Sequence, residues 1–117
     1  MSTGYKLTVR AGARVDRTKF ELLDDALAEL RRRAEEVRDA GGLPAVSSIR
    51  SFKPSDRVAA RLEISSGGWF RGADAGVDVM GDGSFVAFSG GMARTALEPR
   101  HRETAFDAVR RALPRAG

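Results

Sequence analysis

The clearest pattern in the chain is an alternation of hydrophobic and polar residues over residues 5–10 and, with Ala59 at one of the polar positions, over residues 57–64. A period of two predicts strands with one apolar face, because successive side chains on a strand point to opposite sides. Gly12 predicts a turn after the first of these strands, since glycine accepts positive φ at no steric cost. A second strand is expected over residues 15–20, where the alternation is weaker.

Apolar residues then recur at steps of three and four between Leu23 and Val37, which predicts an amphipathic helix. Thr18 and Glu21 have the spacing of a capping box, which would begin this helix a turn earlier. Gly41 and the glycine after it are expected to end the helix.

The middle of the chain after residue 64 is rich in glycine and predicts further strands. A strand is expected over residues 69–80, with bulges at its glycines. Asp82-Gly83 favours a two-residue type I′ hairpin turn, and residues 84–88 form the return strand. Residues 92–97 are expected to continue that strand.

A second apolar stripe covers residues 105–113 and predicts the last helix, with Thr104 and Asp107 as a weaker cap. The elements therefore follow the order ββα-βββα, with short connections that make neighbouring strands antiparallel. We predict an α+β fold in which an antiparallel sheet of about five strands carries two helices on one face. Residues 1–117 are expected to form a single small domain.

Composition removes several classes of chemistry. The chain has no cysteine and a single histidine, His101, so thiol chemistry and a multi-histidine metal site are excluded. No glycine-rich nucleotide-binding motif occurs. We therefore expect no cofactor and no metal, and a non-catalytic protein is favoured. With no signal-peptide pattern and no apolar run long enough for a membrane span, a cytoplasmic protein with no membrane partner is expected.

The net charge of +4 is unevenly distributed. Residues 1–20 carry five basic and one acidic side chain, and residues 94–117 carry six and three, whereas residues 21–40 carry four and seven. If the two basic ends are neighbours in space, they form one patch suited to phosphate contacts; otherwise they are scattered solvating charges. The candidate nucleic-acid-binding residues are Arg10, Arg14, Arg17, Arg100, Arg102, Arg110 and Arg111.

A second candidate site is the hairpin that carries Trp69, Phe70 and Arg71 between glycines. Two aromatic rings and an arginine there suit a protein partner or stacked bases, although Trp69 could instead cover the edge of the core. Arg61 is expected, together with Ala59 and Glu63, on the outward face of its strand.

These observations predict a non-catalytic binding module that recognises a protein partner or a second copy of itself, in which case a C2 homodimer is the commonest form. The partner-binding residues would be Trp69, Phe70, Arg71 and Arg61. A nucleic-acid-binding domain is the first alternative. The second is an enzyme or small-ligand protein with an unrecognised site between the sheet and the connector at 43–54.

Overall fold

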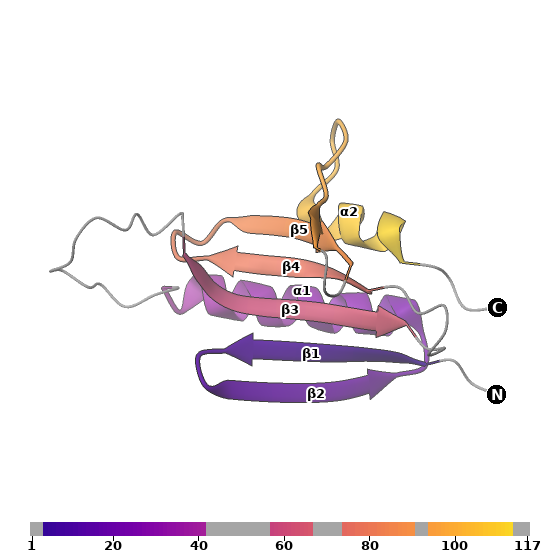
Figure 1. The fold of residues 1–117 in the computed structure, drawn as a ribbon, viewed down its shortest axis with the longest axis horizontal. Coiled ribbons are helices and arrows are strands. Elements are labelled where there is room, and N and C mark those ends of the chain that lie inside the picture. Colours follow the sequence, from indigo (N-terminus) through magenta and orange to yellow (C-terminus); the bar gives the residue numbers. More distant parts are fainter. Residues whose placement is uncertain (1–3, 42–56, 67–73, 91–93, 114–117) are drawn as a thin grey trace, which may run out of the picture.

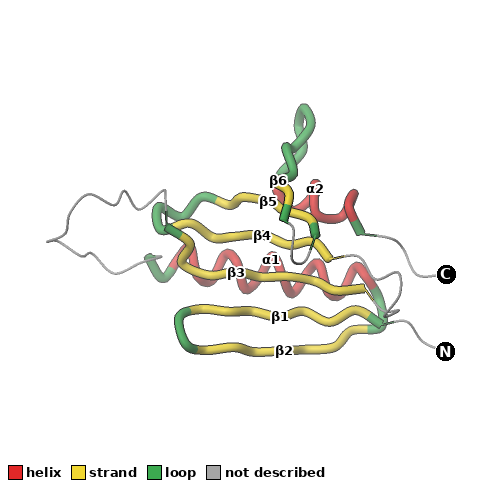
Figure 2. Tube along the Cα trace, viewed as in Figure 1, coloured by secondary structure: helices red, strands yellow, loops and turns green. Residues whose placement is uncertain are grey.

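The computed structural model describes residues 4–41, 57–66, 74–90 and 94–113. Its elements are β1 (Tyr5–Ala11), β2 (Arg14–Phe20), α1 (Leu23–Asp39), β3 (Val58–Ser66), β4 (Asp74–Met80), β5 (Phe85–Ser89), β6 (Thr95–Ala96) and α2 (Ala105–Ala112). The strands form one antiparallel sheet in the order β2-β1-β3-β4-β5-β6. Both helices pack on one face of it (Figures 1 and 2). The α+β prediction is confirmed.

The sheet has six strands because the chain turns back after β5. Thr95 and Ala96 pair antiparallel with Ser89 and Phe88 to form β6, so the expected straight continuation of the strand is wrong. At the opposite edge lies β2, which pairs with β1 over seven residues without a break in register. The first hairpin thus forms one edge of the sheet, and β3 lies between it and the strands β4 and β5 (Figure 1).

The core lies between the sheet and the two helices. Val9, Leu62 and Val77 stand opposite one another on β1, β3 and β4, and their side chains are buried. Leu30 of α1 and Val109 of α2 are fully buried in the same cluster. Burying each such side chain contributes about 1.5–3 kcal/mol, so the alternating pattern of the strands fixes which face the helices cover.

Gly76 allows β3 and β4 to approach closely. A Cβ atom at this position would collide with the carbonyl oxygen of Leu62 on the neighbouring strand. The predicted bulge at this glycine is wrong, because Glu63 and Gly76 pair in regular register; the irregularity lies between Val58 and Ala60 instead. Gly72 lies outside the described residues.

The hairpin turns differ from one another in their glycine positions. Between β1 and β2 the loop is Gly12-Ala13, and Gly12 has a φ of 61°, which suits the first position of a type II′ turn. Between β4 and β5 only Gly83 has positive φ, and its N–H donates to the carbonyl of Met80. The predicted type I′ turn is therefore wrong, since it requires positive φ at Asp82 as well.

The two helices begin in different ways. Thr18 lies within β2, opposite Leu7, so the capping box predicted there is wrong and α1 begins at Leu23 without a side-chain cap. At α2 the weaker prediction holds in full: the Asp107 N–H donates to Thr104 Oγ1 at 3.1 Å, and the Thr104 N–H donates to Asp107 Oδ2 at 2.9 Å. In the described part of the chain, no helix is long and apolar enough to cross a membrane.

Candidate binding face of the sheet

The sheet face opposite α1 and α2 is called the open face here, because no described helix covers it. Leu7 and Val9 of β1 point into the core, so the residues between and beside them point the other way. Cross-strand register extends this assignment over the sheet, because directly paired residues share a face. The open face carries Lys6, Thr8, Arg10, Val15, Arg17, Lys19, Val58, Arg61, Glu63, Ser65, Asp74, Gly76, Asp78, Met80, Val86 and Phe88.

Four exposed cations, the basic quartet, lie on the β1–β2 part of this face: Lys6, Arg10, Arg17 and Lys19. Lys6 stands directly opposite Lys19, an arrangement of like charges that destabilises a strand pair. None of the four forms an ion pair with another described residue. The quartet thus contributes positive potential to the surface, and the charge of Arg10 also acts on a described carboxyl, that of Glu63.

Arg61, a predicted partner-binding residue, lies on the open face but is held by two other side chains. Its Nε and Nη2 donate to the two carboxylate oxygens of Asp78 at 2.7 and 3.0 Å. Its guanidinium also lies 5.8 Å from the ring centre of Phe88, and that of Arg94 lies 5.2 Å from the same ring. Phe88 is only 3% exposed, and two cations lie over its ring on this face.

Glu63 is a partly buried carboxyl near the middle of the open face, opposite the buried Thr8. Burial raises the pKa of Glu63 above its usual value, and the negative charge of Asp74 raises it further. The positive charges of Arg94, Arg61 and Arg10 act in the opposite direction without cancelling the rise in this pKa.

Apolar side chains surround the Arg61–Asp78 ion pair on the same face. Val58 stands opposite Met80, and Val86 stands opposite Asp78. Val58 and Val86 are 41% and 42% exposed. The open face therefore combines a basic part on β1 and β2 with exposed apolar groups on β3 to β5. Val58 continues the alternating apolar stripe of its strand in the sequence, but the irregularity between Val58 and Ala60 takes it off that stripe.

The two basic ends of the chain do not form one patch. β1 and β2 lie at one edge of the sheet, while α2 packs on β4 and β5 (Figure 1). Arg110 is paired with Asp24 at 2.6 Å, and Arg111 with Glu103 at 3.0 Å. Of the predicted nucleic-acid-binding residues, Arg10, Arg14 and Arg17 lie on the first hairpin, and Arg100, Arg102, Arg110 and Arg111 lie in or before α2.

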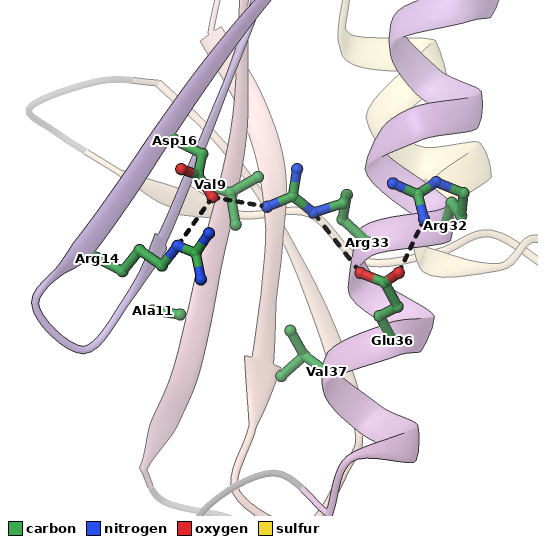
Figure 3. A pocket seen from close by; sticks show the side chains of 8 residues that line it. All are labelled: Val9, Ala11, Arg14, Asp16, Arg32, Arg33, Glu36 and Val37. Carbon is green, nitrogen blue, oxygen red and sulfur yellow. Dashed lines mark hydrogen bonds and ion pairs between the residues drawn. The ribbon is translucent and has the colours of Figure 1, made fainter.

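The hairpin residues Trp69, Phe70 and Arg71, and the connector at 43–54, lie outside the described residues. A different cavity, of about 410 Å³, opens on the helix-facing side of β2, between that strand and α1 (Figure 3). Its lining residues are Val9, Ala11, Arg14, Asp16, Arg32, Arg33, Glu36 and Val37.

Ion pairs satisfy the charges that line this cavity. Asp16 lies between two cations, 3.4 Å from Arg14 Nε and 3.0 Å from Arg33 Nη2. Arg32 Nη1 lies 2.8 Å from Glu36 Oε2 (Figure 3). Arg33 belongs to a run of three arginines in α1, and its contact with Asp16 depends on where β2 lies relative to α1, which local sequence does not determine.

The described residues hold no group of three or more His, Asp or Glu side chains arranged to bind a metal ion. What they offer to a ligand is the basic quartet, the exposed valines of the open face and the cavity beside β2. Comparison of the chain with models of protein families, with curated proteins and with solved structures finds no match.

Proposed function

We propose that the protein is a non-catalytic binding module that recognises an acidic protein partner through the open face of its sheet. The observation that carries this proposal is the basic quartet: four exposed cations on one face, unpaired among the described residues. Complementary charge speeds encounter and selects partners, which is the use that such a surface suits.

The charge of the face favours a different protein over a second copy of this chain. Its strands contribute five cations, namely the quartet and Arg61, against three carboxylates, Glu63, Asp74 and Asp78. Five minus three leaves each copy with +2, so two open faces repel one another. The same charges attract the acidic surface of a different protein.

The middle of the face favours protein over nucleic acid. Glu63 and Asp74 place negative charge where a phosphate backbone crossing the sheet would lie. The exposed Val58 and Val86 suit the apolar core of a protein interface, in which arginine is also enriched. Phe88, the described aromatic residue on this face, is covered and therefore not free to stack on bases.

The proposal is tested by reversing charge on the quartet. In the variant Lys6→Glu with Lys19→Glu, one like-charged cross-strand pair replaces another, so the strain between β1 and β2 is retained. Arg100→Glu with Arg102→Glu makes the same change in net charge on exposed residues beside α2 and serves as the matched control. Each tagged protein is used to capture partners from an extract of the native organism, with and without nuclease.

We expect the wild type and the control to retain an acidic protein in a nuclease-resistant, salt-sensitive manner. The quartet variant should bind it on the order of tenfold more weakly, which corresponds to ~1.4 kcal/mol. Equal retention by both variants would contradict the proposal. Retention that disappears with nuclease would instead support the nucleic-acid-binding alternative.

A further inference from the structure

The free edge of β2 is a second surface beside the basic quartet. β2 is the outermost strand of the sheet and runs for seven residues without a bulge or a proline. Its two-residue hairpin loop must close on a hydrogen-bonded pair, Ala11 and Arg14. Hydrogen-bonded and non-hydrogen-bonded pairs alternate along antiparallel strands. Val15, Arg17 and Lys19 therefore direct their backbone N–H and C=O groups away from β1, toward the free edge.

The two sides of this edge differ in chemistry. On the open face the side chains of Arg17 and Lys19 are exposed and basic. On the helix-facing side lies the cavity of about 410 Å³, whose apolar part is formed by Val9, Ala11 and Val37. A strand added to β2 would place every second side chain on each of these two sides.

The cavity suits an apolar side chain better than an acidic one. Asp16 already accepts a hydrogen bond from Arg33 at 3.0 Å, and Arg32 donates to Glu29 and Glu36 at 2.6 and 2.8 Å. A further carboxylate would compete with these ion pairs, whereas an apolar group would cover the valines.

We propose that an extended segment of the partner adds to the sheet as a strand along the free edge of β2. Its acidic side chains face Arg17 and Lys19, and its apolar side chains enter the cavity between β2 and α1. This is β-strand addition, in which main-chain hydrogen bonds provide affinity and pockets for alternate side chains provide specificity. The inference rests on the proposed function, because it describes how part of the acidic partner is held.

The test uses a labelled peptide of alternating Glu and Val, about as long as β2, with a poly-Glu peptide of the same length as its control. We expect the alternating peptide to bind at least about tenfold more tightly than poly-Glu, at peptide concentrations up to about 1 mM. Amide hydrogen exchange measured by NMR on the wild type should slow at Val15, Arg17 and Lys19, which acquire hydrogen-bond acceptors. Exchange at Asp16 and Thr18 should change less, because their N–H groups already bond to β1.

Two substitutions separate backbone pairing from charge. Val15→Pro removes an outward N–H without changing charge, and Val15→Thr retains that N–H as the matched control. The proline variant should lose peptide binding about tenfold or more, while the threonine variant should bind as the wild type does. No binding of the alternating peptide, equal binding of poly-Glu, or unchanged exchange at Val15 and Arg17 each overturns the strand addition.

The failure of this inference can be distinguished from failure of the proposed function. One outcome is that Val15→Pro captures as much of the acidic partner from extract as the wild type does, while the Lys6→Glu, Lys19→Glu variant does not. In that case strand addition is wrong, and binding through the open face is supported. If both capture it fully, both proposals are wrong.

Discussion

Glu63 shows how one residue connects the charge of the open face to the stability of the fold. Its carboxyl is partly buried and lies near Asp74, so both burial and like charge favour its neutral form. The raised pKa means that the folded protein binds a proton more tightly here than the unfolded chain does. Folding stability therefore falls as the pH rises above the ordinary glutamate range and Glu63 ionises.

Glu63→Gln should therefore increase the free energy of unfolding at pH 7 and leave it nearly unchanged at about pH 4, where glutamate is largely protonated. Because the side chain is partly exposed, the gain is expected to be a few tenths of a kcal/mol. Urea denaturation at several pH values measures it. A Gln variant that is less stable than the wild type at pH 7 would show that attraction to Arg94, Arg61 and Arg10 outweighs burial.

Arg61 shows the difference between predicting the face on which a residue lies and predicting the residues that it contacts there. Alternation placed Arg61 on the outward face correctly, since Leu62 beside it is buried. That it is held by Asp78 and covers Phe88 depends on the register of β3 against β4 and β5. A period of two determines the face of a residue, but not which residues on neighbouring strands stand opposite it.

Among the elements, α2 depends most on its first residues, because it is only eight residues long and short helices are marginal without tertiary contacts. The reciprocal bonds between Thr104 and Asp107 satisfy N–H groups that the helix itself leaves unpaired. Phe106 then packs edge-on against Phe85 of β5, with ring centres 5.0 Å apart.

Thr104→Ala should lower the free energy of unfolding by about 1 kcal/mol, because the N-cap bond to Asp107 is lost. Thr104→Ser keeps a hydroxyl at the same place and is expected to retain most of that stability. Thermal or urea unfolding followed by circular dichroism compares the two. Equal losses in both variants would mean that the methyl group, and not the cap, carries the effect.

The first residues of the two helices show when a cap can be predicted from local sequence and when it cannot. The spacing of Thr104 and Asp107 predicted a cap that forms, whereas Thr18 and Glu21 have the same spacing, with the better-fitting Glu, but no cap. Thr18 is taken into β2 because pairing with Leu7 of β1 competes with the helix for the same backbone groups. Local spacing was therefore overridden by a strand partner more distant in sequence.

At the scale of the whole molecule, the sheet order determines which charges meet. The periodic patterns predicted the class of the fold and the helical face of the sheet. They could not determine that β1 pairs with β3, which places β3 between the first hairpin and the strands β4 and β5 that α2 covers. Whether the arginines form a single patch, one of two alternatives that the sequence left open, depended on that pairing, whereas the basic quartet depends only on the short hairpin between β1 and β2.

A free, regular edge strand such as β2 can pair with the same strand of a second copy. The charged side chains of β2 oppose this self-association. Natural edge strands commonly carry charged side chains that prevent edge-to-edge pairing. β2 bears Arg14, Arg17 and Lys19 against Asp16, so two copies paired along this edge would bring together two strands of net charge +2. We expect the wild type to be a monomer by light scattering at low ionic strength.

Arg17→Thr with Lys19→Thr removes these charges while retaining β-forming residues. This variant should associate in a concentration-dependent manner, as neutral edges become able to pair. Arg100→Thr with Arg102→Thr loses the same charge away from the edge and should remain monomeric. A monomeric edge variant would contradict this role for the charges. A dimeric wild type would also contradict it, and pairing of two copies along the β2 edge would then be the first arrangement to test.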